Sequence, residues 1–362
     1  MSAARHISRL VVTTGGTGGH IFPALAVAAE VRRREPEARV LFLGGSGPEG
    51  ELARKAGLDF LALPASGVLG KGLKALLATV WVGRSVILAT RALRRFAPQA
   101  VIGFGGDAGF CPVLAAALLG IPAAVHEQNS VPGVTNRILG RLVRRVFVSF
   151  EDHGRHFPPA KVVRSGNPVR AEIAAVAHTP GAGRNLLVLG GSQGAKALND
   201  MVVAALPRLL AARVNVLHQA GRADEQRIRD AYRAGGADDA RVQGFVEDMA
   251  GAYAWADLAV CRAGASTIFE LAATGTPSVL VPFPFAAHDH QRVNARHLES
   301  LGAAVLADQK DLDGESLAKI VLGLLGDGAK LADMGRAARG FARPDAAAEI
   351  VDGLEELCRQ AA

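Results

Sequence analysis

Three segments of this 362-residue chain place a cluster of glycines between an apolar run and an alanine-rich stretch. The first, VVTTGGTGGHIFPALAVA at 11–28, contains four glycines and ends its loop at His20. GGSQGA at 190–195 repeats the pattern, and GFGGDAG at 103–109 is a third example. Glycine lets a backbone approach an anion closely, and the helix that follows adds roughly half a positive charge at its N-terminus. The pattern therefore predicts two phosphate-binding loops and a third loop able to close the same groove.

Other glycine-loop chemistries match these segments less closely. A dinucleotide fingerprint needs GxGxxG and an acidic residue at the end of the next strand. Here Gly16 and Gly18 are followed by Ile21 where the third glycine belongs, and the next expected strand, ending VLFLGG, has no acid. The phosphate loop GxxxxGK[ST] is missing as well. A tight turn without a ligand stays open as the alternative, and two loops in matched positions disfavour it.

His20 stands at the start of the helix expected after the first loop. The positive end of a helix dipole disfavours an imidazolium, which leaves a neutral imidazole able to accept a proton. We therefore predict that His20 takes part in the chemistry of the site. The alternative is structural, since the ring could cap the helix or bond a nearby carbonyl.

Composition limits the classes of partner. Lys and Arg outnumber Asp and Glu by 41 to 34, a formal net charge of +7, which favours an anionic partner. Aromatic residues make up 5% and are not interleaved with basic stretches, which argues against a nucleic-acid partner.

Cys111, Cys261 and Cys358 form no CxxC or Cys/His ligand spacing, so we expect reduced thiols. The most apolar stretch, 75–90, is interrupted by Arg84 and is too short to cross a bilayer.

Short apolar runs alternate with longer alanine-rich segments along the whole chain. This alternation predicts an α/β fold in which parallel strands, buried on both faces, are joined by helices. The segments at 11–28 and 190–195 share the order strand, glycine loop, helix. This repeat predicts two Rossmann-like, doubly wound parallel-sheet domains facing a cleft. Ligands are expected at the carboxyl ends of the strands. We expect domains at 1–165 and 166–341, followed by an amphipathic C-terminal helix at 342–362.

Several motifs occur in a fixed order: TGGTGGHIFPALAVA, GIPAAVHEQNSVPGVTNR, GNPVR, LGGSQGAKALN, the segment 245–284 and HDHQRVNA. Together they resemble the MurG family of N-acetylglucosaminyltransferases over nearly the whole chain. The resemblance implies a GT-B type fold and an inverting, metal-independent transfer of GlcNAc from UDP-GlcNAc. The acceptor would be the C4 hydroxyl of the muramoyl sugar of lipid I, and the products lipid II and UDP. It further implies that the first domain receives lipid I and faces the membrane, that the second binds UDP-GlcNAc, and that the last helix returns to the first.

The resemblance also implies roles for individual residues. Ser192 and the amides around it match diphosphate contacts, with Arg170 beside them. The backbone of Val246 matches a uracil contact, and Glu270 matches a carboxylate that grips the ribose hydroxyls. The implied donor-binding set is Thr17, Gly18, Gly19, Asn129, Arg170, Ser192, Gln193, Gly194, Asn199, Val246, Glu270, His290 and Gln291. The implied acceptor-binding set is Gly15, Gly16, Gly105 and Gly106.

For some of these residues a purely structural role is an alternative to the functional one. His20 is the candidate base and Glu127 the alternative, although His126 and Glu127 could simply satisfy backbone groups in their loop. Residue 130 is Ser, so HEQN is not part of an HExxH metal motif. Glu270 follows Thr267 at capping-box spacing, which by itself favours a helix cap over a ribose ligand.

No cofactor or metal is implied. The only DxD, at 311–313, precedes an expected helix and is best explained by helix capping. Asp107 occupies a position in the third glycine loop where the family often has an aromatic residue. A negative charge near a lipid diphosphate is unfavourable, so this residue puts the acceptor-side role of its position in doubt.

The segment 70–96 has an apolar helical stripe with basic residues around it, which is typical of a core-facing helix or of a membrane-docking surface. We expect peripheral binding of this stripe to an anionic membrane surface on the cytoplasmic side. Its members are Leu73, Leu76, Leu77, Val80, Trp81, Lys71, Lys74 and Arg84.

Two other functions stay open. The first is another GT-B-type UDP-sugar enzyme, such as a diacylglycerol glycosyltransferase or a UDP-GlcNAc 2-epimerase. The second is a membrane-associated scaffold that senses a nucleotide sugar without turnover. Expected partners are UDP-GlcNAc, lipid I, the anionic membrane surface and other cell-wall synthesis proteins.

Overall fold

The structure is a computed structural model that describes residues 6–64, 73–176, 183–191, 194–237 and 241–361, with the side chains of 73–81 outside the description. The chain divides into two compact units. The first contains Met1–Arg170 together with Arg343–Ala362, and the second contains Ala171–Ala342. Each unit is described by itself.

The first unit is built on a seven-stranded, wholly parallel sheet in the order β3-β2-β1-β4-β5-β6-β7. Its strands are β1 (Arg9–Thr13), β2 (Arg39–Gly44), β3 (Asp59–Ala62), β4 (Ala100–Gly103), β5 (Ala123–Glu127), β6 (Arg145–Val148) and β7 (Val162–Arg164). Its helices are α1 (Gly18–Arg34), α2 (Glu49–Lys55), α3 (Leu73–Phe96), α4 (Asp107–Leu118), α5 (Val134–Leu142), η1 (Pro159–Lys161) and α14 (Ala346–Ala361).

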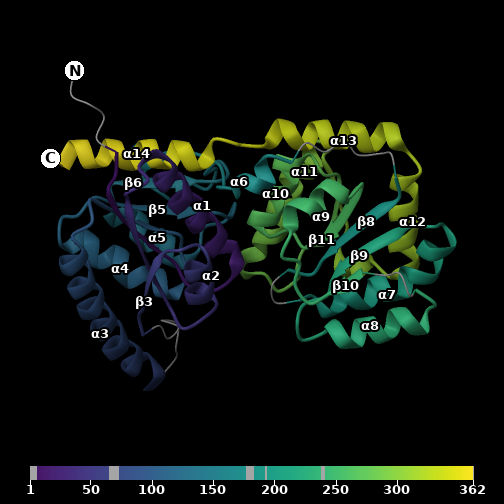
Figure 1. Ribbon diagram of the computed structural model, residues 1–362, viewed down its shortest axis with the longest axis horizontal. Coiled ribbons are helices and arrows are strands. Elements are labelled where there is room, and N and C mark those ends of the chain that lie inside the picture. Colours follow the sequence, from purple (N-terminus) through teal and green to yellow (C-terminus); the bar gives the residue numbers. More distant parts are fainter. Residues whose placement is uncertain (1–5, 65–72, 177–182, 192–193, 238–240, 362) are drawn as a thin grey trace. The chain divides into compact units, whose positions relative to one another are not determined.

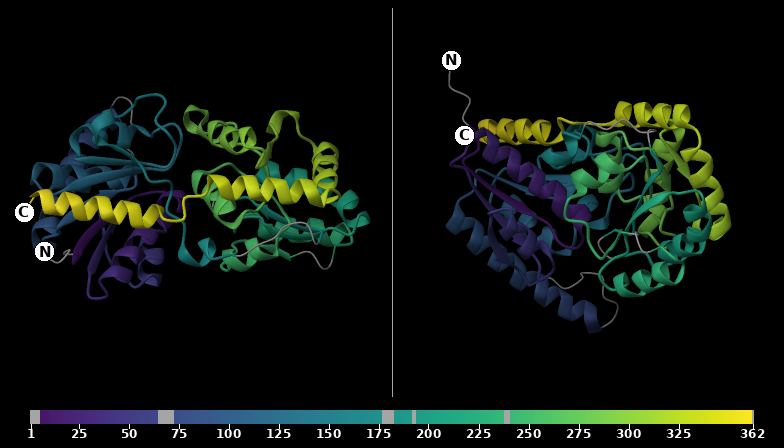
Figure 2. Two further views of the ribbon diagram at one scale, coloured as in Figure 1. Left: turned by 90° about the horizontal axis from the view of Figure 1, so that it is seen from above. Right: turned by 45° about the vertical axis from the view of Figure 1, so that its right-hand side comes forward.

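Helices cover both faces of this sheet because its central strands are apolar on both sides. In β1, Leu10 and Val12 belong to one buried cluster, while Val11 between them belongs to another. Successive side chains of a strand point to opposite faces, so a continuous apolar run needs a core above and a core below. One core receives α1 and α14, including Leu354, and the other receives α4 and α5. Figures 1 and 2 show α14, in yellow, lying along this unit.

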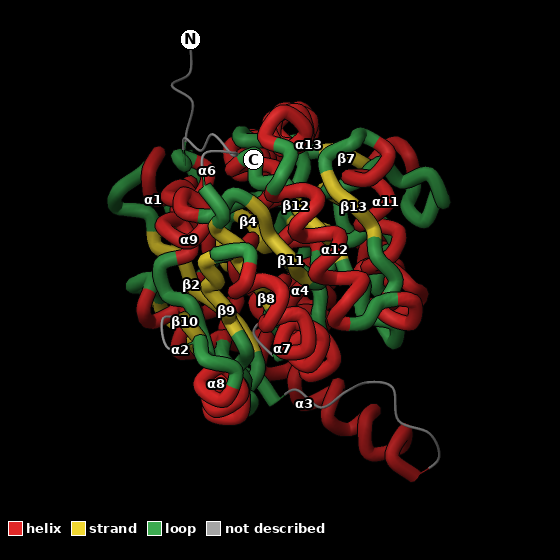
Figure 3. The backbone as a smooth tube through the Cα atoms, turned by 90° about the vertical axis from the view of Figure 1, so that its right-hand side faces the viewer, coloured by secondary structure: helices red, strands yellow, loops and turns green. Residues whose placement is uncertain are grey.

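The second unit repeats the plan with a six-stranded parallel sheet in the order β10-β9-β8-β11-β12-β13. Figure 3 faces this unit and shows its strands among helices. The strands are β8 (Asn185–Leu189), β9 (Asn215–Gln219), β10 (Arg241–Gln243), β11 (Leu258–Cys261), β12 (Ser278–Leu280) and β13 (Ala304–Leu306). The helices are α6 (Ala171–Ala174), α7 (Lys196–Ala211), α8 (Glu225–Ala234), α9 (Met249–Trp255), α10 (Ala265–Thr274), η2 (Ala287–Asp289), α11 (His290–Ser300), η3 (Gln309–Asp311), α12 (Gly314–Leu325) and α13 (Gly328–Phe341).

Both sheets reverse their strand order at one place. The first reverses between β1 and β4 and the second between β8 and β11, and ligands of open α/β sheets bind beside such a reversal. The loops 14–17 and 104–106 follow β1 and β4, and the loop 190–195 follows β8. The two Rossmann-like parallel-sheet domains predicted from the sequence are therefore confirmed, with all three glycine loops at a reversal.

The two glycine loops of the first unit touch through their backbones. Gly15 N–H donates to the Gly105 carbonyl at 3.3 Å, and the Thr14 hydroxyl donates to the same oxygen at 3.1 Å. A Cβ on Gly106 would lie 2.0 Å from the Gly15 carbonyl oxygen, and Gly106 has a φ of 75°. Glycine is required there by both space and conformation.

The core of the second unit contains a buried polar group. His218 on β9 lies between Tyr232 and Asn199, with its Nδ1 at 2.9 Å from the Tyr232 hydroxyl and its Nε2 at 3.0 Å from Asn199 Oδ1. Burial lowers the pKa of His218 to about 4. The imidazole is therefore neutral in the folded protein at neutral pH.

Replacing Gly106 with alanine tests the contact between the glycine loops. Gly106→Ala is expected to lower the free energy of unfolding by roughly 3 kcal/mol or more, because it adds an overlap and a disfavoured φ. Gly83→Ala is the matched control, since no described atom lies within 4 Å of its Cβ position in α3. It should stabilise the helix by up to about 1 kcal/mol. Equal effects in denaturant unfolding would contradict the packing described.

Acidification tests the buried histidine. The folded-state pKa of His218 lies below its usual value of 6.5, so the unfolded chain takes up the proton first as the pH falls. Neutral His218 contributes fully to the free energy of unfolding above pH 6.5, and this contribution is lost as the pH falls toward 4. The loss is on the order of 2 kcal/mol between pH 7.5 and 5. The free energy of unfolding should therefore fall less over this range in His218→Gln than in the unsubstituted protein. Parallel pH curves would rule out this role.

Candidate active site

The glycine loop after β1 ends at the N-terminus of α1. Its N-cap, Thr17, makes no side-chain capping bond, and the first turn of α1 has no acidic residue. Gly16 N–H donates to Glu49 Oε1 at 2.8 Å, and Glu49 is buried at the start of α2. A carboxylate 33 residues away thus holds the loop, and no feature of the sequence indicated it.

His20 is the third residue of α1 and is half-buried. Its Nδ1 lies 2.8 Å from Oε1 of Gln128, which is buried just beyond the end of β5. Its Nε2 has no hydrogen-bond partner among the described residues. The ring therefore contacts a side-chain amide, and not the helix end or backbone carbonyl that the sequence left open.

Glu127 is buried and organises the loop between β5 and α5. Its Oε1 accepts hydrogen bonds from the backbone N–H and side-chain amide of Asn129, at 2.9 and 3.5 Å. Its Oε2 accepts from Gly133 N–H at 3.1 Å and from Asn136 Nδ2 at 2.9 Å. Glu127 thus satisfies backbone groups, as the structural alternative expected, and it fixes the loop that carries Asn129.

Arg170 ends the first unit and lies against α1. Its guanidinium carbon is 4.4 Å from the centroid of the Phe22 ring, a distance at which a cation is attracted to the face of the ring. This contact holds the basic side chain of Arg170 against Phe22, which follows His20 by two residues in α1. The NPVR motif indicated Arg170 as a site residue, whereas nothing in the sequence indicated its contact with Phe22.

The second unit has two helix N-termini beside its strand-order reversal. Ser192 and Gln193 lie outside the described residues, while Gly194 has a φ of 74° and its N–H donates to the Gly191 carbonyl at 3.0 Å. Neither α7 nor α10 has a capping side chain or an acidic residue in its first turn. Their positive ends are therefore not offset by acids of their own.

Glu270 and Val246 are both buried in the second unit. Tyr253 Oη donates to Glu270 Oε2 at 3.0 Å. The N-cap of α10 is Gly264, so Thr267 is the third residue of the helix and not its cap. The capping-box explanation of Glu270 is therefore wrong. Val246 lies in the loop that follows β10. The uracil contact expected of its backbone would be made at this strand end.

His290 and Gln291 begin α11 after a strained stretch of backbone. His288 and Asp289 both have left-handed conformations, with φ of 53° and 54°, which is costly for residues other than glycine. Gln291 Oε1 accepts from Phe283 N–H at 2.9 Å, and His290 Nδ1 lies 2.7 Å from the Ala287 carbonyl. Strain of this kind clusters at functional sites, which is in keeping with the donor-sugar roles expected here.

Asn199 is buried and already engaged. Its Nδ2 donates to the Ala220 carbonyl at 2.9 Å and to Asp224 Oδ2 at 2.7 Å, while its Oδ1 faces His218. Both amide hydrogens are used, so in this structure the side chain ties α7 to the loop after β9 and presents no group to a ligand.

Two aspartates lie at helix starts. Asp313 is the N-cap of α12 and forms a capping box with Ser316, which confirms the capping explanation of the DxD segment. Asp107 is the exposed first residue of α4, where a carboxylate interacts favourably with the helix dipole. The described residues include no group of three or more His, Cys, Asp or Glu placed to hold a metal.

Of the predicted membrane stripe, Lys71 lies outside the described residues, and the side chains of the members between 73 and 81 are not described. Arg84 is exposed on α3. No helix in the described part of the chain combines the length and apolar character that a membrane span needs.

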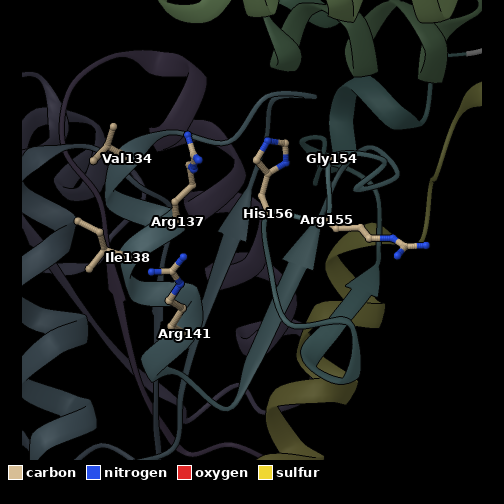
Figure 4. Close-up of a pocket in the computed structure, with 7 residues that line it drawn as sticks. All are labelled: Val134, Arg137, Ile138, Arg141, Gly154, Arg155 and His156. Atoms are coloured by element: carbon tan, nitrogen blue, oxygen red, sulfur yellow. The ribbon is translucent and has the colours of Figure 1, made fainter.

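A second basic and apolar surface lies on the outer face of α5. Val134, Ile138 and Leu142 are exposed there, and Arg137 and Arg141 border a pocket of about 370 Å³. Neither guanidinium makes an ion pair or hydrogen bond within the described part of the chain. Figure 4 shows both extending from α5 on the same side, whereas Arg155, in the facing loop, points away from them.

The chain matches two family domains along most of its length. Residues 10–148 match the glycosyltransferase family 28 N-terminal domain, and residues 185–350 match the glycosyltransferase family 28 C-terminal domain. The first stretch holds the paired glycine loops, and the second holds the loops after β8 and β11.

Curated proteins are similar over nearly their full length. One from Nitratidesulfovibrio vulgaris (strain DP4) is 55% identical over 357 residues, covering 97% of this chain and 98% of its own. One from Solidesulfovibrio magneticus is 56% identical over 359 residues, covering 96% and 97%. Both are named UDP-N-acetylglucosamine--N-acetylmuramyl-(pentapeptide) pyrophosphoryl-undecaprenol N-acetylglucosamine transferase.

A solved structure agrees with these relatives. The crystal structure of Acinetobacter baumannii MurG is 33% identical, covers 96% of this chain and 99% of its own, and has a TM-score of 0.77. The chain therefore belongs to glycosyltransferase family 28 and, within it, to the MurG family.

Proposed function

We propose that this protein transfers GlcNAc from UDP-GlcNAc to the C4 hydroxyl of the N-acetylmuramyl sugar of undecaprenyl-pyrophosphoryl-linked lipid I, yielding lipid II and UDP in peptidoglycan synthesis. The observation that carries the proposal is identity of 55 to 56% over nearly the whole chain to transferases named for this reaction. The proposal is also supported by the glycine loops at the strand-order reversals, whose backbone N–H groups would bind the two diphosphate substrates.

The reaction is an inverting displacement. The C4 hydroxyl oxygen attacks C1 of GlcNAc, its proton passes to His20 Nε2, and the bond from C1 to the UDP oxygen breaks with its electron pair. A preorganised acceptor for the proton contributes typically 10²- to 10⁴-fold in rate. His20 suits this role because its Nε2 is unengaged among the described residues while its Nδ1 is held by Gln128. Glu127, whose two oxygens each accept two hydrogen bonds, is less suited to it.

The departing UDP carries the charge that must be stabilised. We assign this to the backbone N–H groups at the starts of α7 and α10, with Ser192 and Arg170 contributing. Donors of this kind, already aimed at developing charge, are worth up to about 3–4 kcal/mol each. Glu270 would hold the ribose hydroxyls, and Gln291 and His290 the donor sugar. The paired loops containing Gly15, Gly16, Gly105 and Gly106 would receive the acceptor diphosphate.

The direct test is transfer of labelled GlcNAc to a short-chain lipid I analogue, with and without EDTA. The unsubstituted protein should turn over equally in both. His20→Ala should lower kcat by 10²- to 10⁴-fold. Glu270→Gln should mainly raise KM for UDP-GlcNAc, because it weakens the ribose contact and leaves the reacting atoms untouched. Reversible loss of turnover on chelation would contradict the mechanism, and release of an epimerised free sugar without acceptor would favour an epimerase.

We further propose that the first unit binds the anionic cytoplasmic face of the membrane, where a lipid-linked acceptor is found. The outer face of α5 supports this, because it carries exposed apolar residues and arginines that form no ion pair with any described residue. Basic residues near an anionic bilayer gain about 1 kcal/mol each, and the apolar side chains add burial at the interface. Arg84, which is exposed on α3, and the stripe predicted before it are proposed to bind the same membrane.

Vesicle co-sedimentation tests the membrane surface. Replacing Arg137 and Arg141 together with Gln should weaken binding to phosphatidylglycerol-containing vesicles by roughly 30-fold, about 1 kcal/mol per charge. The matched control is Arg155→Gln, because the Arg155 side chain points away from Arg137 and Arg141 and its loss should matter much less. The loss should shrink at high salt. Equal losses from Arg155 and from the pair would refute the α5 surface.

A further inference from the structure

Gln128 connects His20 to the interior of the first unit. Its amide nitrogen lies 3.0 Å from His126 Nδ1 and donates to the His126 carbonyl at 3.1 Å. Its amide oxygen faces His20 Nδ1 at 2.8 Å. On the far side, His126 Nε2 lies 2.9 Å from the Gly166 carbonyl. Four groups thus form one line of hydrogen bonds, of which only His20 is more than slightly exposed.

The direction of every bond in this line follows from its inner end. The Gly166 carbonyl oxygen can only accept, so His126 carries its hydrogen on Nε2. Burial lowers the pKa of His126 to about 4, so the ring is neutral and its Nδ1 is a bare acceptor. Only the NH₂ end of the Gln128 amide can donate to that atom, which fixes the orientation of the amide.

The outer end of the line is then determined. With its nitrogen toward His126, Gln128 turns its oxygen to His20, and an amide oxygen can only accept. His20 must therefore carry its hydrogen on Nδ1. A neutral imidazole with Nδ1–H has its lone pair on Nε2, the atom with no hydrogen-bond partner among the described residues.

We propose that Gln128 is a positioning residue that fixes the tautomer and the ring orientation of His20, and that it does so under the control of the Gly166 carbonyl through His126. Gln128 itself touches no reacting atom. The catalytic consequence rests on the proposed role of His20 as base. The tautomer assignment does not, because it follows from the hydrogen bonds alone.

Long-range ¹H–¹⁵N NMR of the ¹⁵N-histidine-labelled protein tests the assignment without turnover. The chain has ten histidines, so the His20 signals are assigned by their absence from His20→Gln. We expect His20 to show a protonated Nδ1 and an unprotonated Nε2. In Gln128→Met, which neither donates nor accepts, this preference should be lost. In Gln128→Glu, which still accepts, it should be retained. A His20 with Nε2–H in the unsubstituted protein would overturn the proposal.

Kinetics separate positioning from simple structural support. Gln128→Met should lower kcat at least about 10-fold, a part of what a general base contributes, with KM for UDP-GlcNAc changed less than about twofold. Gln128→Glu should recover part of this loss. Gln99→Met is the matched control, since Gln99 also makes three hydrogen bonds, to Ser8 and Arg9 at the start of β1, and its loss should leave kcat unchanged.

The two proposals fail in different ways. If His20 has the expected tautomer but His20→Ala keeps full kcat, the base assignment is wrong and the line of hydrogen bonds stands. If His20→Ala is inactive while Gln128→Met keeps both kcat and the tautomer, Gln128 is not a positioning residue and the base assignment stands.

Discussion

Backbone N–H groups at helix starts, beside the strand-order reversals, are the constraint on which the rest of the structure depends. Under the proposed function an anion approaches them where side chains are absent, and glycines occupy the loops after β1, β4 and β8. The helices behind these loops are aimed by parallel strands buried on both faces, and those strands need cores above and below. Within each unit, the cores and the sheet order therefore determine where the glycine loops and the helix starts lie.

Side chains around these loops add what backbone amides cannot supply. Glu49 holds the loop that contains Gly16, and Glu127 holds the loop that contains Asn129. Both carboxylates are buried and accept hydrogen bonds from backbone N–H groups, which limits the movement of each loop. His20 differs from these two carboxylates in being only half-buried, and its Nε2 makes no hydrogen bond within the described residues. In the proposed reaction this nitrogen is the atom that receives the proton of the acceptor hydroxyl.

Fold and loops could be predicted from the sequence because they depend on local patterns. Continuous apolar runs indicate doubly buried strands, and glycines between a run and a helix indicate an anion loop. The line from His20 to Gly166 could not be predicted, since His126 and Gly166 are 40 residues apart and an amide's orientation depends on all its neighbours. At Glu270 a local pattern was misleading. The capping-box spacing from Thr267 to Glu270 is present, but α10 begins at Ala265, so Thr267 lies inside the helix and does not cap it.

The central claim is that helix-start amides of the second unit bind the donor diphosphate without a metal ion. Titrating UDP into ¹⁵N-labelled protein in the presence of EDTA, and following amide shifts by transverse-relaxation-optimised NMR, tests it most directly. The account predicts saturable shifts that are largest at the starts of α7 and α10, including Gly194 and Ala265. Largest shifts elsewhere, or binding that appears only when a divalent cation is restored, would contradict it.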